Sequence, residues 1–214
     1  MLDRKKRYLQ VALNSTLDEA RDIIAMLPKS DRIIIEAGTP LIKRYGTDAI
    51  RQLSYLHSYV IADLKTFDRG ETEVSLSKNA GASAAVASGM APLETLNIFI
   101  KSCRDNNLDS MIDMMNVDAP IKVLRRLKKI PDVVILHRGV DEEVFNKSKP
   151  IPYLQINKVR ASYNTLIAIA GGDTIREVQR AIFNDANIVV VWKEFYKSSE
   201  ATSRLAAEFL KVIK

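Results

Sequence analysis

Eight short apolar runs recur along the chain, with enough residues between neighbouring runs for a helix. They cover residues 8–13, 32–37, 59–64, 84–87, 110–115, 133–136, 166–170 and 188–191. Most are continuous rather than alternating, which is typical of strands that are buried on both faces. The pattern therefore predicts eight buried strands.

The segments between these runs have the spacing of amphipathic helices. Apolar residues recur three or four positions apart in segments 17–27, 93–100, 175–182 and 199–213. In the last segment one stripe comprises Leu205, Phe209 and Ile213, which we expect to pack against the outside of the sheet. Thr16-Leu-Asp-Glu19 and Thr174-Ile-Arg-Glu177 fit the capping box and predict helix starts.

The strict alternation of strand and helix predicts a parallel sheet, because parallel strands need crossover connections. Eight such units in 214 residues favour a closed (β/α)8 barrel, near the lower end of the usual length for that fold. An open doubly wound sheet is the alternative. No linker rich in Pro, Gly or Ser divides the chain, so we expect residues 1–214 to form a single-domain (β/α)8 TIM barrel.

Charge and cysteine content narrow the class of protein. The net charge is +6, but the basic residues stand in short clusters without alternating aromatic residues, which indicates a solvated surface rather than nucleic-acid binding. The single cysteine, Cys103, excludes an internal disulfide framework. No run approaches the roughly 18 apolar residues of a membrane helix, and the start is unlike a signal peptide. We expect a soluble, cytoplasmic protein with no membrane or nucleic-acid partner.

Polar residues gather where the predicted strands end, which is where (β/α)8 barrels carry their active sites. Glu36 and Asp113 lie inside apolar runs, where a charge is costly unless it is paired or used. Asp63 and Lys65 are two residues apart and point the same way, so they could form only a structural ion pair. Their coincidence with Glu36 and His137 at equivalent strand ends favours a functional site.

Two further residues have simpler interpretations. His57 precedes a predicted strand, so we expect it at the opposite rim of the barrel. Cys103 lies in a predicted helix, where a core residue is more common than a nucleophile.

The segment Asp63-Leu-Lys-Thr-Phe-Asp68 resembles the Asp-x-Lys-x-x-Asp motif of the orotidine 5′-monophosphate decarboxylase suprafamily. The stretches 36–43, 69–73, 137–142 and 170–172 are similar to the branch that contains 3-hexulose-6-phosphate synthase and 3-keto-L-gulonate-6-phosphate decarboxylase. The resemblance runs from about residue 9 to residue 210. It implies a (β/α)8 barrel and a carbon–carbon lyase.

The resemblance also implies a mechanism. A Mg²⁺ ion would bind between Glu36 and Asp63 and stabilise an enediolate formed on a sugar phosphate, as in the joining of formaldehyde to ribulose 5-phosphate. Lys65 would lie near the oxyanion, and His137, with Arg138, would move protons. Asp68 would reach the neighbouring subunit's site, which implies a homodimer. The residues expected to bind substrate are Asn14, Glu36, Asp113, Gly171, Gly172 and Lys193.

Four positions depart from the family pattern. Asn14 stands where the family has aspartate, Asn116 where it has glycine, and Asp173 where an apolar residue follows Ala-Gly-Gly. Trp192-Lys193 replaces a Gly-Gly or Gly-Arg pair whose backbone approaches the phosphate. These changes keep a second hypothesis open, in which the barrel is repurposed or non-catalytic and binds a different ligand or partner.

Overall fold

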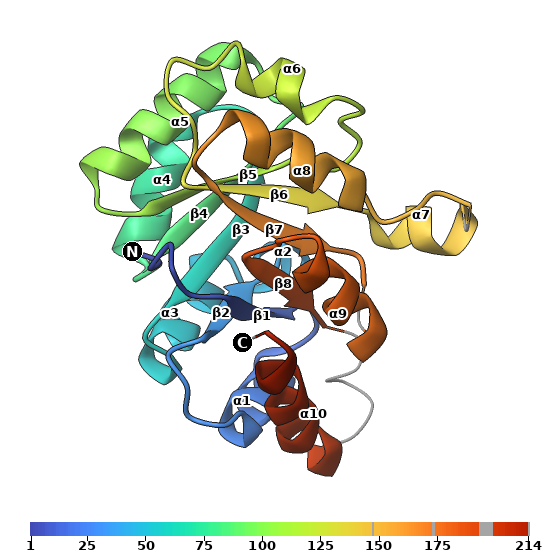
Figure 1. The fold of residues 1–214 in the computed structure, drawn as a ribbon. Helices are drawn as coiled ribbons and strands as arrows, with labels where there is room; N and C mark the ends of the chain where they lie inside the picture. Colours follow the sequence, from blue (N-terminus) through green and yellow to red (C-terminus); the bar gives the residue numbers. More distant parts are fainter. Residues whose placement is uncertain (147, 173, 193–198, 214) are drawn as a thin grey trace.

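A computed structural model describes residues 1–146, 148–172, 174–192 and 199–213, with the backbone alone for residues 199–201. Eight parallel strands pair in chain order and close into a barrel, in which the last strand pairs with the first (Figure 1). The strands are β1 (Tyr8–Leu13), β2 (Ile33–Ala37), β3 (Val60–Thr66), β4 (Ala84–Ser88), β5 (Asp109–Asp113), β6 (Val133–His137), β7 (Leu166–Ala170) and β8 (Ile188–Val191). The predicted barrel is confirmed, and the open sheet is excluded.

Helices alternate with the strands and surround the barrel (Figure 1). They are α1 (Leu17–Met26), α2 (Thr39–Tyr45), α3 (Thr47–Leu56), α4 (Gly70–Asn79), α5 (Leu93–Asp105), α6 (Pro120–Leu124), α7 (Val140–Phe145), α8 (Tyr153–Ser162), α9 (Ile175–Phe183) and α10 (Ser199–Val212). Both predicted capping boxes are present, at Thr16 before α1 and at Thr174 before α9. None of the helices in the described ranges has the length and apolar character needed to cross a bilayer.

Two strand ends differ by two residues from the sequence-based prediction, and both of these differences matter for the site; β4 and β6 each end one residue later than predicted. β3 continues to Thr66, so Lys65 belongs to the strand rather than to the loop after it, together with Asp63. β5 ends at Asp113 instead of residue 115, since the chain turns away through Asn116, which has a positive φ of 58°. Continuous apolar composition could not locate either end.

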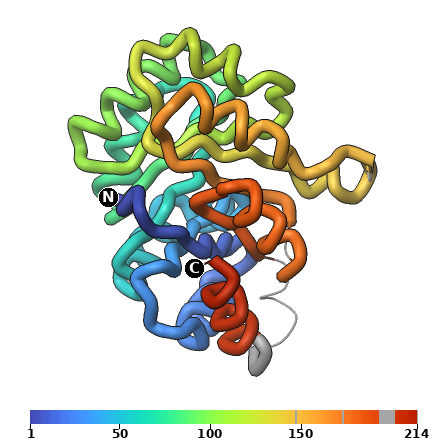
Figure 2. Tube along the Cα trace, in the orientation of Figure 1, coloured from blue at the N-terminus to red at the C-terminus, as the bar shows by residue number. Residues whose placement is uncertain are grey.

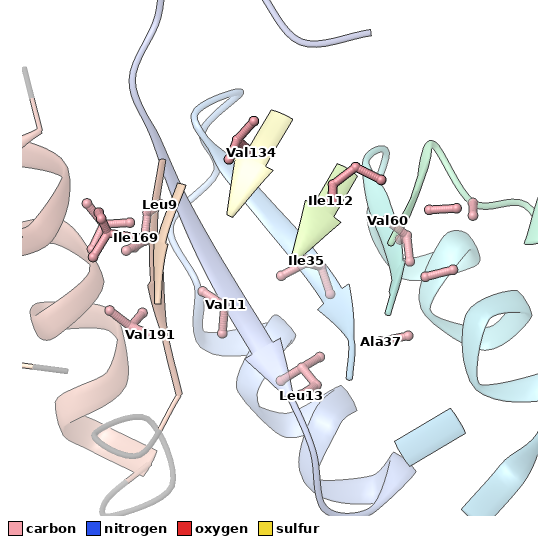
Figure 3. Close-up of a cluster of buried hydrophobic side chains, with 14 of the residues drawn as sticks. Leu9, Val11, Leu13, Ile35, Ala37, Val60, Ile112, Val134, Ile169 and Val191 are labelled. Atoms are coloured by element: carbon pink, nitrogen blue, oxygen red, sulfur yellow. The ribbon is translucent and has the colours of Figure 1, made fainter. Parts of the chain in front are cut away.

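Side chains of the barrel alternate between two apolar layers. One layer lies between the strands and the helices and includes Leu9, Val11 and Leu13 of β1 (Figure 3). The other fills the barrel interior and includes Ala12 and Ile34. Because successive strand residues face opposite sides, the inward series continues at the carboxyl ends into polar side chains. Those polar residues are Glu36, Asp63, Asp113 and His137.

The last helix, α10, packs against the outside of the barrel beside β1. In the tube view the red α10 runs beside the blue helix α1, against which it packs (Figure 2). Phe209 and Ile213 are fully buried and Leu205 packs against the same core, which confirms the predicted stripe. Arg32 donates hydrogen bonds to the carbonyls of Leu210 (3.0 Å) and Ile213 (3.3 Å), fixing the helix end over β2.

Candidate active site

A hydrogen-bonded cluster centred on Asp113 joins three strands at the mouth of the barrel. The Asp113 Oδ2 accepts from Lys65 Nζ of β3 and from His137 Nδ1 of β6, both at 2.8 Å. Its other oxygen, Oδ1, accepts from the Met115 backbone N–H at 2.9 Å. The side chain of Asp113 is therefore fully paired, and it holds the lysine and the histidine in fixed positions.

Burial and charge act against each other in this cluster. Burial alone would raise the pKa of Asp113, but His137 and Lys65 hold it well below its usual range. Burial alone would lower the pKa of Lys65, but Asp63 and Asp113 raise it above its ordinary value. Burial would also lower the pKa of His137, but Asp113 outweighs that effect and raises it. The Asp113 carboxylate and the Lys65 ammonium are thus stable as a charged pair at neutral pH.

A local irregularity in β3 places Lys65 in this cluster. The pairing between β3 and β4 shifts between Ala62 and Thr66, as at a β-bulge. Lys65 has a φ of 47°, a left-handed conformation that costs a non-glycine residue on the order of 1–3 kcal/mol. Bulges beside active sites commonly redirect a side chain. Here the bulge allows Lys65 to contact both Asp63 and Asp113.

Asp63 is the second acid at the mouth, and only 5% of it is exposed. Its Oδ2 accepts from Lys65 Nζ at 2.8 Å and from the Thr39 hydroxyl at 3.0 Å. The same hydroxyl proton is shared with the Asp63 carbonyl oxygen, which lies 2.8 Å from the Thr39 oxygen. The Oδ1 of Asp63 is buried and has no hydrogen-bond partner among the described residues. That oxygen is available to a ligand.

Glu36 completes the acidic side of the mouth. Gln10, one strand away and buried in the barrel, donates its Nε2 proton to Glu36 Oε2. Burial, and then the negative charge of Asp63, raise the pKa of Glu36 to about 7. Two buried carboxylates that repel each other would be stabilised by a cation between them.

The residues present fit a magnesium ion in part. Glu36 and Asp63 offer hard carboxylate oxygens, and the unpartnered Oδ1 of Asp63 is a suitable ligand atom. Across the described ranges there is no group of three or more His, Cys, Asp or Glu side chains placed to hold a metal. Magnesium is often held by one or two carboxylates together with water and substrate oxygens, and the pair suits that mode.

Arg138 and the two glycines form the β6–β7 side of the mouth. The guanidinium of Arg138 donates to the carbonyls of Gly171 (2.9 Å) and Lys149 (3.3 Å). Gly171 has a φ of 101°, and a β-carbon there would lie 2.4 Å from the Arg138 carbonyl oxygen, so glycine is required. Gly172 precedes the α9 N-terminus, where free amides favour anions. Arg138 thus holds the glycine turn, a contact that the sequence did not indicate.

The structure places two more of the residues that depart from the family pattern, Asn14 and Trp192. The amide oxygen of Asn14 lies 1.9 Å from the position of a β-carbon on residue 38, so Gly38 lets this side chain reach the β2–α2 turn. Trp192, partly buried, packs against the apolar cluster inside the barrel, so its ring lies at the β8 side of the mouth. Asp173 and Lys193 lie outside the described residues.

The remaining sequence predictions concern residues away from this cluster. Asp68 is exposed in the segment between β3 and α4, and its reach into a neighbouring subunit stays a prediction. His57 follows α3 at the opposite rim and contacts the Tyr59 backbone. Cys103 is fully buried in α5. Both expectations for His57 and Cys103 are confirmed.

Two side chains at the site were not singled out from the sequence, namely Gln10 and Thr39. Gln10 was detectable as a lone polar residue within the apolar run 8–13. Thr39 lies in the Gly-Thr-Pro segment that follows Glu36, but its contact with Asp63 depends on the pairing of β2 with β3.

Two curated proteins are similar to this chain over most of its length. It is 40% identical over 195 residues to the bifunctional enzyme Fae/Hps of Methanocaldococcus jannaschii, covering 90% of this chain and 49% of that protein. It is 36% identical over 211 residues to the bifunctional enzyme Fae/Hps of Methanothrix thermoacetophila, covering 97% of this chain and 53% of that protein. The chain therefore spans about half the length of these curated relatives.

Solved structures agree with the fold. The 3-hexulose-6-phosphate synthase of Salmonella typhimurium is 26% identical, with a TM-score of 0.85 over 96% of this chain and 98% of that one. The 3-keto-L-gulonate-6-phosphate decarboxylase of Vibrio cholerae is 19% identical, with a TM-score of 0.77 over 97% of each chain, a likeness of fold alone.

The model of the orotidine 5′-phosphate decarboxylase / HUMPS family matches residues 7–207. The chain belongs to that family.

Proposed function

We propose that this protein is a magnesium-dependent carbon–carbon lyase that acts on a sugar phosphate through an enediolate. The reaction would resemble that of 3-hexulose-6-phosphate synthase, in which formaldehyde is joined to ribulose 5-phosphate. The observation that carries the proposal is the hydrogen-bonded Lys65–Asp113–His137 cluster beside Asp63 and Glu36. The likeness to hexulose-phosphate synthases supports the same activity.

The residues can perform the proton transfers that this reaction needs. A carboxylate only accepts, so the bond to Asp113 places a proton on Nδ1 of His137. The Nε2 atom then faces no hydrogen-bond partner among the described residues and can exchange a proton with the sugar carbon. Lys65, kept charged by two carboxylates, would stabilise negative charge on the substrate oxygen.

The new bond would form between the deprotonated sugar carbon and the carbon of formaldehyde, and the formaldehyde oxygen would gain a proton. Glu36 and Asp63 would hold the magnesium ion. Magnesium, when bound, supplies Lewis-acid stabilisation of the negative charge that develops on the sugar oxygens. Gly171 and Gly172 would contribute backbone amides to the phosphate group. In this proposal the protein is a cytoplasmic homodimer in which Asp68 contacts the partner's site.

The test is an assay of formaldehyde consumption with ribulose 5-phosphate and Mg²⁺. Lys65→Met should lower kcat/KM at least about a thousandfold, because it removes the charge at the reacting oxygen. Lys158→Met, an exposed lysine on α8, is the matched control and should leave the rate unchanged. Wild-type protein that shows no turnover with pentulose or hexulose phosphates would rule out the lyase proposal.

The second candidate is a barrel of the same family that binds a different ligand without catalysis. Trp192 favours it, because its ring packs at the mouth where a bare glycine backbone would approach a phosphate. Calorimetric titration with ribulose 5-phosphate separates the two candidates. Absence of binding by both the wild type and Trp192→Gly would favour the second.

A further inference from the structure

A cavity of about 500 Å³ lies outside the barrel, between the β5–α6 loop and the start of α8. Its volume falls within the range of small-molecule sites, roughly 300–1,000 Å³. Its walls are largely apolar and include Val117, Leu136, Ile151 and Tyr153. The residues that line it come from the loop before α6, the end of β6, the start of α8 and α9. His137 and Arg138 of the candidate active site also line it, so the cavity adjoins the mouth of the barrel at the end of β6.

The charged residues of this cavity are mostly cations. Among the described residues that line it, three are cations, Arg138, Lys149 and Arg180, and one is a carboxylate, Asp118. Lys149 is paired with Glu142. Arg180 has no ion pair with any described residue, and its guanidinium lies over the Tyr153 ring, 5.6 Å from the centroid. The guanidinium of Arg180 can therefore still bind an anion.

Arg138 provides the second observation. Its Nε is buried and has no hydrogen-bond partner in the described part of the chain. A buried donor without a partner costs about 1–3 kcal/mol, so a ligand oxygen that reached it would be stabilised. Its other nitrogens are used by the carbonyls of Gly171 and Lys149.

We infer that this outer cavity binds a small organic anion, a molecule with an apolar body and one anionic group. The apolar body packs on Leu136, Ile151 and the Tyr153 ring, and the anionic group pairs with Arg180. Arginine suits this role because its planar guanidinium binds oxyanions while it stacks on an aromatic ring. Since Arg138 joins the cavity wall to the carbonyl of Gly171, the bound anion lies next to the glycine turn proposed to hold the substrate phosphate.

The probe for this site is 1-anilinonaphthalene-8-sulfonate, an aromatic anion whose fluorescence rises in apolar surroundings. We expect saturable binding of one probe per chain. Arg180→Gln should weaken it roughly tenfold, the effect of losing one charge-assisted hydrogen bond. Arg176→Gln, one turn earlier on α9 and absent from the lining, is the matched control and should bind as the wild type does.

Two further measurements place the probe. Gln155→Trp puts a large ring into the cavity lining and should abolish binding, while cooperative thermal unfolding verifies that the variant folds. Excess ribulose 5-phosphate should not displace the probe, because the sugar phosphate belongs at the barrel mouth. Equal affinity for Arg180→Gln and Arg176→Gln, or displacement by ribulose 5-phosphate, would overturn the inference. Binding is read without catalysis, so the result does not depend on the lyase activity.

Discussion

Replacing Asp113 with asparagine tests the charge arrangement at the centre of the site. Asparagine preserves the shape of the side chain but removes the charge that Lys65 and His137 share. Two unit charges about 4 Å apart attract by about 4 kcal/mol at an effective dielectric constant near 20. Lys65 keeps Asp63 at 2.8 Å, and the amide oxygen can still accept one hydrogen bond. The loss therefore belongs at the lower end of the range for broken buried pairs, about 3 kcal/mol at pH 7.

A loss of that size should lower the melting temperature by roughly 6–12 °C in a chain of this length. The loss should also depend on pH. Because Asp113 raises the pKa of His137, the stabilisation from His137 is complete below its unfolded pKa of about 6.5 and is lost as the pH rises through the folded pKa. The difference in unfolding free energy between wild type and Asp113→Asn should thus shrink above pH 6.5.

The assay that isolates this effect is an NMR titration, because the chain has only two histidines. Burial lowers the pKa of His57 at the far rim, so His57 serves as an internal reference that Asp113→Asn should leave unchanged. His137 should titrate above the ordinary value in the wild type. In Asp113→Asn it should titrate below that value, because burial then acts without the opposing charge. A His137 resonance that keeps its high midpoint in the variant would refute this reasoning.

Four other outcomes are expected. Without metal, the free energy of unfolding should fall as the pH rises from about 4.5 to about 7, because folded Glu36 keeps its proton up to about pH 7 and the unfolded chain does not. In urea titrations, Glu36→Gln should flatten this dependence on pH. Mg²⁺ should raise the melting temperature more at pH 8 than at pH 6 in scanning calorimetry, since it competes with that proton. Mixing inactive Asp68→Ala with inactive Lys65→Met should restore part of the formaldehyde consumption if the homodimer shares its sites. Phe209→Ala should lower the free energy of unfolding by about 3–5 kcal/mol in chemical denaturation, because the ring is fully buried where α10 packs against the outside of the barrel.

The sequence predicted the barrel because its strands are buried on both faces. A run such as 166–170 is apolar throughout, and it became β7 with identical bounds. The ends of β3 and β5 were harder to place, since they depend on the bulge before Thr66 and on the left-handed turn at Asn116. Glycine adopts such left-handed conformations readily, so a glycine in the sequence would have indicated them. Here Lys65 and Asn116 adopt them instead.

The site was predictable where a charge interrupts an apolar strand. Glu36, Asp63 and Asp113 were identifiable because burying a carboxylate is costly, so its presence in a strand indicates a partner or a function. The partners themselves were not identifiable. That Asp113 joins Lys65 to His137 depends on the pairing of β3, β4, β5 and β6 around the barrel, and those residues are far apart in the chain.

The two halves of the barrel mouth differ in the contacts that their side chains make. The half built from β2, β3, β5 and β6 holds a hydrogen-bonded cluster, in which Lys65 adopts a strained conformation and contacts two acids. Strain of this kind persists only when surrounding contacts compensate for it, and a barrel that needed stability alone would gain by losing it. The half built from β7 and β8 keeps the Gly171 turn but places the Trp192 ring at the mouth. The hydrogen-bonded cluster and the side of the mouth that carries Trp192 are built from different strands, so Trp192 fits a changed substrate as well as it fits a barrel that binds without catalysis.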